Sequence, residues 1–70
     1  MKQETVRMIV EVSEWAQKEG NIFILKIDGE RMGNPDTCVV SYPQDPSRAY
    51  RQDSATLDEA VASCYSKFFT

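Results

Sequence analysis

Histidine is absent from this 70-residue chain, and cysteine occurs only twice. Histidine is the side chain that most often acts as a general base near neutral pH and as a transition-metal ligand, so its absence excludes the commonest acid–base and metal-dependent active sites. Cys38 and Cys64 allow one disulfide at most, and we expect both to be reduced thiols packed as small apolar groups in a cytoplasmic protein. The sequence therefore predicts a protein that is not an enzyme and has no catalytic residue, metal ligand or cofactor.

A strong excess of one charge and long apolar runs are also missing. The chain has 8 Lys and Arg against 11 Asp and Glu, a formal net charge of −3, so no basic field favours a nucleic-acid partner. Charged residues recur through the first 20 positions, and we expect neither a signal peptide nor a membrane span. One domain, 1–70, is expected. A chain this short buries only about 60% of its unfolded surface, so we expect a protein partner or a second copy to add stability.

The first segment with a clear pattern, residues 3–19, predicts an amphipathic helix. On a helical wheel the charged side chains share one side, and the apolar ones gather opposite them: Met8, Ile9, Val12, Trp15 and Ala16. Gly20 and Asn21 then supply a left-handed stop. Trp15, the only tryptophan, is expected either to anchor the core or to lie at its margin.

Three strands are expected between this helix and the last one. Residues 21–28 are rich in branched and aromatic side chains and predict a mostly buried strand, followed by a loop over 29–36. Residues 37–42 alternate, with Cys38, Val40 and Tyr42 on one face. After a proline-rich turn, residues 48–52 predict a short third strand, on which Arg48 and Tyr50 share one face and Arg51 points the opposite way.

The last helix is expected over residues 57–68, since Thr56 and Glu59 have the spacing of a capping box. Its apolar stripe contains Leu57, Ala60, Val61, Cys64 and Phe68. Phe68 and Phe69 are adjacent and cannot both face this stripe, so one of them is predicted to be exposed or buried against a partner, which is a hint of dimerisation.

This order predicts an α+β domain with two layers. Short connections favour antiparallel strands, so the α-β-β-β-α order gives a small antiparallel three-stranded sheet. Both amphipathic helices then cover one face of that sheet. No repeat or linker interrupts this pattern.

The candidate binding residues are arginines and tyrosines: Arg31, Tyr42, Arg48, Tyr50 and Arg51. These side chains are typical of interfaces and of phosphate recognition. Three interpretations remain open, namely an edge strand protected by charge, a surface for a macromolecule, or a site for a small anion. Asp28, Glu30 and Asp36 also cluster around the first loop, where they are either solvated turn residues or ligands of a divalent ion, although their spacing matches no EF-hand.

Two segments resemble the HicB antitoxin family, VSYPQDPS over residues 40–47 and TLDEAV over 56–61. The resemblance covers residues 38–64 and consists of a strand ending in an aromatic residue and proline, a Pro-x-x-Pro turn, and the start of a capped helix. Asp45-Pro46-Ser47 replaces the usual Leu-Pro-Gly of that family. The resemblance implies an RNase-H-like or double-stranded-RNA-binding-like layer of strands and helices that binds and blocks a small basic toxin. Asp58 and Glu59 stand where the RNA-binding domains have lysines, which disfavours RNA.

The leading hypothesis from the sequence is a small non-enzymatic binding protein that blocks or sequesters a partner macromolecule, as antitoxins, immunity proteins and phage-type inhibitors do. The alternative is a domain that binds an anionic metabolite or nucleotide through Arg31, Arg48 and Arg51. In the first case the partner is a protein, with self-association as a further route to stability, and neither nucleic acid nor membrane is expected.

Overall fold

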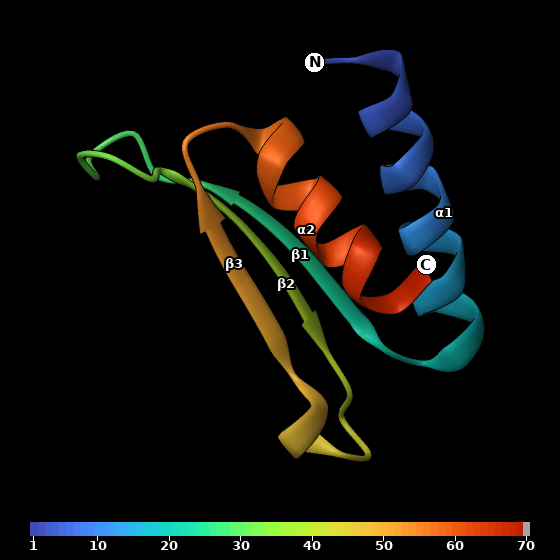
Figure 1. Cartoon of the computed structure of the whole chain (residues 1–70). Coiled ribbons are helices and arrows are strands. Elements are labelled where there is room, and N and C mark those ends of the chain that lie inside the picture. The colour runs from blue at the N-terminus through green and yellow to red at the C-terminus, as the bar shows by residue number, and fades with distance from the viewer. Residues whose placement is uncertain (70) are drawn as a thin grey trace.

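The computed structural model describes residues 1–69. Over these residues the elements are α1 (Gln3–Glu19), β1 (Ile22–Ile27), β2 (Asp36–Ser41), the 3-10 helix η1 (Pro46–Arg48), β3 (Tyr50–Ser54) and α2 (Leu57–Phe69). The three described strands form one antiparallel sheet in the order β1-β2-β3, and both helices lie on the same face of it (Figure 1). The expected α+β architecture is confirmed.

The register of the sheet divides its side chains between two faces. β2 is the central strand, and Val39 lies between Ile24 of β1 and Arg51 of β3. On the face covered by the helices, alternate residues of β2 point inward, as the sequence predicts for Cys38 and Val40. The opposite face, which we call the outer face, carries no helix among the described residues.

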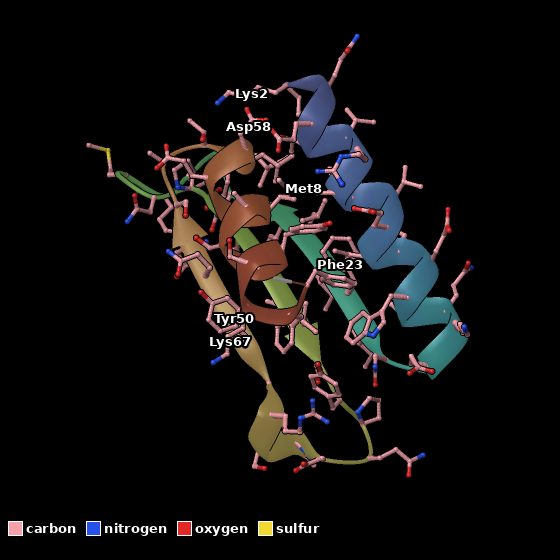
Figure 2. All side chains as sticks on the ribbon, turned by 45° about the vertical axis from the view of Figure 1, so that its right-hand side comes forward. Lys2, Met8, Phe23, Tyr50, Asp58 and Lys67 are labelled. Atoms are coloured by element: carbon pink, nitrogen blue, oxygen red, sulfur yellow. The ribbon has the colours of Figure 1, made fainter. Side chains whose placement is uncertain are left out.

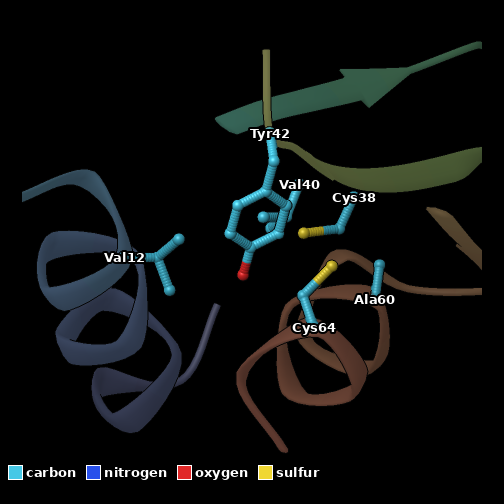
Figure 3. Close-up of a cluster of buried hydrophobic side chains, with 6 residues drawn as sticks. All are labelled: Val12, Cys38, Val40, Tyr42, Ala60 and Cys64. Atoms are coloured by element: carbon cyan, nitrogen blue, oxygen red, sulfur yellow. The ribbon is translucent and has the colours of Figure 1, made fainter. Parts of the chain in front are cut away.

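The core is built from all the layers (Figure 3). Its buried side chains are Val12 of α1, Cys38 and Val40 of β2, Tyr42 after β2, and Ala60 and Cys64 of α2. Each comes from a stripe predicted by its own periodicity, since helical spacing places the α1 and α2 residues and alternation places those of the strand. Because all of these side chains except Tyr42 are small, the core is thin, and half-buried aromatic side chains surround it.

Both helix boundaries that the sequence marks are confirmed. Gly20 ends α1 with φ of 70°, the left-handed conformation that favours glycine, and its amide donates to the Ala16 carbonyl. The Glu59 amide donates to the Thr56 hydroxyl over 3.2 Å and so caps α2. The second half of the capping box differs, because the Glu59 carboxylate accepts from the Thr56 hydroxyl and not from the Thr56 backbone amide.

The two helices run in the same direction along the sheet (Figure 1). Their N-termini are joined by the backbone amide of Lys2, which donates to the Asp58 carboxylate over 3.1 Å, and Figure 2 shows these residues at that end. The Thr5 hydroxyl and this amide lower the pKa of Asp58. Their C-termini point to the opposite end of the molecule, toward the turn between β2 and β3. Within residues 1–69, neither helix combines the length and the apolar character needed to cross a membrane.

Two predictions about the strands are wrong. β1 is not mostly buried, since Ile22, Ile24 and Ile27 are exposed. Ile22 and Ile24 point to the open outer face, and Ile27 lies at the end of an edge strand. The third strand begins at Tyr50, two residues later than predicted, because Pro46 starts a turn of 3-10 helix that includes Arg48. Arg48 therefore shares no strand face with Tyr50.

Candidate functional site

The structure divides the five predicted binding residues between two places. Tyr42, Arg48 and Tyr50 lie at the end of the molecule where both helices terminate. Arg31 and Arg51 lie on the outer face of the sheet, where both contact one aspartate. The three arginines named for an anionic ligand therefore do not meet in one site.

At the first place, aromatic and cationic side chains form a mixed surface. We call it the end surface, and it consists of Trp15, Tyr42, Arg48, Tyr50, Lys67 and Phe68. Phe68 lies at its centre. The Phe68 ring centroid is 6.1 Å from that of Trp15, 5.7 Å from that of Tyr42 and 5.9 Å from that of Tyr50. Such ring pairs add stability beyond the apolar area that they bury.

The adjacent Phe68 and Phe69 both pack within the chain. Phe69 contacts Trp15 at 5.4 Å and Tyr65 at 5.1 Å between centroids, while Phe68 turns toward the sheet. The prediction that one of the pair is exposed or needs a partner to cover it is wrong, since both rings are half-buried within the chain. α1 lies beside α2 and offers a second apolar surface in addition to the sheet. Phe68 therefore packs on the sheet side of α2, and Phe69 packs on the side of α1. Trp15 lies half-buried between the two rings, at the margin of the core.

A short turn holds Arg48 in place. The Asp45 amide donates to the Tyr42 carbonyl, and the Arg48 amide donates to the Asp45 carbonyl over 3.0 Å. The Ser47 hydroxyl donates to the Asp45 carboxylate. This geometry places the Arg48 guanidinium over the Tyr42 ring, 4.1 Å from its centroid, which is a favourable cation–π distance.

On the neighbouring side of the end surface, Lys67 of α2 lies beside β3. Its ammonium is 5.9 Å from the centroid of the Tyr50 ring, and Figure 2 shows the two side chains next to each other. Sequence reasoning missed Lys67, Trp15 and Phe68 as members of this surface. Their helical spacing assigns them to a last turn or to a core stripe, and only the packing of α2 on the sheet brings them to Arg48.

The end surface contains an open hollow of about 510 Å³. It is lined by Trp15, Glu19, Asn21, Tyr42, Arg48, Lys67 and Phe68. Both helices end here, so their carbonyl ends contribute partial negative charge, which Arg48 and Lys67 offset. The hollow thus presents aromatic faces with two cations, Arg48 and Lys67, and one carboxylate, Glu19, among its lining residues. The side of the hollow that carries the two cations is suited to an apolar side chain flanked by a carboxylate.

On the outer face, the remaining two arginines are already engaged. The Arg31 guanidinium lies 3.3 Å from the Asp53 carboxylate, and so does Nε of Arg51. The hydroxyl of Thr37, which accepts from Arg31, donates to the same carboxylate. The Thr37 hydroxyl is the largest cause that lowers the pKa of Asp53, and the two arginines lower it further. This cluster joins the first loop to the sheet and places paired charges on the edge strand β3.

Of the three acidic residues around the first loop, Asp28 holds the turn. The Asp28 carboxylate accepts the Glu30 amide over 3.1 Å and lies 3.9 Å from Nε of Arg31. Within residues 1–69, no three acidic or cysteine side chains are grouped so as to hold a metal ion.

The two cysteines face each other across the core, one from β2 and one from α2 (Figure 3). Both are free thiols, and Cys38 and Cys64 are 0% and 1% exposed. The hydrogen bond between the sulfurs, together with burial, raises the pKa of the Cys38 thiol above its ordinary value. A buried thiol of raised pKa is a poor nucleophile, so Cys38 contributes packing. Cys64 is equally inaccessible to solvent and packs against it.

Comparison with protein-family models, with curated protein sequences and with solved structures finds no match to this chain. The resemblance to the HicB family over residues 38–64 stays a prediction from the residues that carry it.

Proposed function

We propose that this chain is a small non-enzymatic binding protein of the cytoplasm that blocks or sequesters a partner macromolecule, as antitoxins, immunity proteins and phage-type inhibitors do. The end surface supports this proposal. Arg48 stacks on Tyr42 at its rim, 4.1 Å from the ring centroid. Tryptophan, tyrosine and arginine are the residues in which binding energy concentrates at protein interfaces.

The charges of the end surface favour an acidic segment of a partner protein. Among the described residues neither Arg48 nor Lys67 forms an ion pair, in contrast to Arg31 and Arg51 on the outer face. A carboxylate of the partner would find these two cations without displacing an existing salt bridge. The hollow between them would receive an apolar side chain against Trp15 and Phe68.

The test compares three forms of the protein as bait in a lysate of the source cells. Wild-type bait is compared with Arg48→Glu and with the matched control Arg51→Glu, which reverses an arginine on the outer face. We expect one protein to be retained by the wild type and by the control and lost with Arg48→Glu. The purified partner should then bind Arg48→Ala at least about tenfold more weakly than the wild type, since truncating an anchoring arginine costs about 2 kcal/mol or more and about 1.4 kcal/mol is tenfold in Kd. Equal binding by all three baits would overturn the proposal.

A second candidate is a small anionic ligand, and the size of the hollow favours it. Its volume of about 510 Å³ lies within the roughly 300–1,000 Å³ of small-molecule sites. The residues concerned are Arg48 and Lys67, since Arg31 and Arg51 are held by Asp53. A panel of nucleotides and dicarboxylates separates the two candidates. A ligand at about 100 times its Kd raises the free energy of unfolding by about 2.7 kcal/mol, and the absence of any thermal shift would exclude this candidate.

A further inference from the structure

The exposed apolar side chains of this protein gather on one flank. Seven large hydrophobic side chains are exposed among the described residues, and five of them belong to two adjacent elements, α1 and β1. They are Val6 and Val10 on α1, and Ile22, Ile24 and Ile27 on β1. We call the exposed side of these two elements the α1–β1 flank. Ile22 and Ile24 point to the outer face, whereas Val6 and Val10 lie on the helix side of the same edge. Large exposed apolar side chains on adjacent elements are typical of an interaction site.

β1 also presents unpaired backbone groups along this flank. It is an edge strand, and within residues 1–69 no strand pairs with its other side. The Asp28 amide donates to the Pro35 carbonyl, so the backbone of residue 28 faces β2. Because such pairs alternate along an antiparallel ladder, the amides and carbonyls of Phe23, Leu25 and Ile27 point to the free side. β1 is therefore able to accept another strand.

The side of α1 that belongs to this flank carries no charged residue. Gln3, Val6, Val10, Ser13 and Gln17 recur at spacings of three and four and form an uncharged stripe. The charged residues of α1 occupy another side, on which Arg7 contacts Tyr65 of α2. Ser13 and Gln17 line a hollow together with Phe23 of β1. The uncharged stripe therefore faces the side of the molecule on which β1 is unpaired.

We propose that two copies of this chain associate through the α1–β1 flank, with β1 of each copy paired antiparallel to β1 of the other. With a two-fold axis at Leu25, the free amides and carbonyls of Phe23, Leu25 and Ile27 all form hydrogen bonds with the second copy. Leu25 then pairs with Leu25 of the second copy and Phe23 with Ile27, which extends the two sheets into one of six strands. Ile24 lies opposite Lys26 of the second copy, and the two α1 helices approach along their uncharged stripes.

A second copy fits this flank better than a charged partner does. The whole chain has a net charge of −3, so two copies repel each other except where neutral surfaces meet. Lys26 is the only charge within β1, and this register places it opposite an isoleucine, with no like charge facing it. The pairing also accounts for Ile27, which is 68% exposed although it lies on the helix-covered face of the sheet. Phe23 of the second copy would cover it.

The opposite edge of the sheet is unsuited to this role. β3 carries Arg51 and Asp53, and a proline-containing turn precedes it, both of which protect an edge from pairing. A stable interface needs about 800 Å² from each partner. That area is about one sixth of the 4671 Å² surface of this chain, and a strand and a helix side by side can supply it.

The first test measures mass against protein concentration by sedimentation equilibrium. We expect the wild type to change from 8.0 kDa to twice that mass as concentration rises. Ile24→Lys places an ammonium opposite Lys26 of the second copy and should weaken the dimer at least about tenfold. Ile24→Glu places a carboxylate there and should preserve the dimer. Val10→Glu should weaken it, and Met32→Lys, at an exposed position in the first loop, should not.

The second test examines the register by disulfide cross-linking under oxidised glutathione. A mixture of Ile24→Cys and Lys26→Cys chains should form a linked dimer, because residues 24 and 26 face each other at about 4.5 Å between Cα atoms. Ile24→Cys alone should form little, since the same residue in two copies is diagonal, at about 7–8 Å.

A wild type that stays monomeric would overturn the proposal. A dimer weakened equally by Ile24→Lys and Ile24→Glu, or unaffected by Val10→Glu, would do so too. None of these variants touches the end surface, so this proposal and the proposed function stand or fall separately.

Discussion

Phe68 is the residue whose removal should reveal most about how this thin core is held together. Its ring contacts Trp15, Tyr42 and Tyr50 and thereby joins α1, the turn after β2, and β3 to α2. Truncating a fully buried phenylalanine to alanine costs about 3–5 kcal/mol. Phe68 is half-buried, so we expect Phe68→Ala to lower the free energy of unfolding by about 2–3 kcal/mol.

That loss is large for a protein of this size. At about 0.05–0.15 kcal/mol per residue, a chain of 70 residues has a stability of about 4–10 kcal/mol. Each kcal/mol shifts the Tm of a small domain by about 4–8 °C, so Phe68→Ala should lower the Tm by about 10–20 °C. Phe68→Leu keeps much of the apolar volume and should lose about 1 kcal/mol.

Urea unfolding gives the measurement, followed by circular dichroism and by the fluorescence of Trp15. Because Trp15 is the only tryptophan and contacts Phe68, its emission should also change in the folded Phe68→Ala variant. Met32→Ala removes a side chain that is 93% exposed and serves as the control. A loss below about 1 kcal/mol for Phe68→Ala, with unchanged Trp15 emission, would refute the view that the end of α2 closes the core.

Three further predictions concern the capping, the thiols and the outer-face cluster. Thr56→Ala should lower the free energy of unfolding by about 1 kcal/mol in urea titrations, and Thr56→Ser should retain it, because a hydroxyl at this position accepts the Glu59 amide. Cys38 and Cys64 should react with a thiol reagent only as fast as the protein opens, because both are buried. The pKa of Asp53 is lowered in the folded protein, so its contribution to stability is present above about pH 4 and is lost as pH falls through the folded value. Asp53→Asn has no carboxylate to protonate at this position, so its free energy of unfolding should fall less than that of the wild type when the pH is lowered from neutral to acid.

Each of these predictions has a clear contrary result. A Thr56→Ala variant as stable as the wild type would mean that the cap does not hold α2. Thiol labelling in the folded state at the rate of an unfolded control would show that the core is open. An Asp53→Asn variant with the same acid dependence as the wild type would show that other carboxylates control it.

Most of the architecture was predictable because local patterns and global packing agree here. The left-handed stop at Gly20, the cap at Thr56 and the inward alternation of Cys38 and Val40 each depend on neighbours in the sequence. The exposure of β1 was not predictable in this way. A strand in which five of six residues are apolar looks the same when it is buried and when it lies at an edge, and only the strand order decides between the two.

The candidate site was less predictable than the fold. Arg48, Tyr42 and Tyr50 were found from their residue types, and the turn around Asp45 brings Arg48 to Tyr42. Arg31 and Arg51 look equally suitable in the sequence. The pairing of Arg51 with Asp53 is local, since the two residues lie two positions apart on β3 and share its outer face. The pairing of Arg31 with Asp53 depends on the path of the first loop, which has no local signal.

The parallel course of the two helices also has a consequence for how the chain folds. Lys2 and Asp58 are 56 positions apart in sequence, and Val12 joins a core completed by Cys64. The strands can pair through short loops, but α1 lacks half of its surroundings until α2 has been synthesised and has packed. Contacts of such long range slow folding, because the loop must close before they can form. During synthesis, the part of α1 that packs against α2 therefore stays exposed to solvent until α2 has formed.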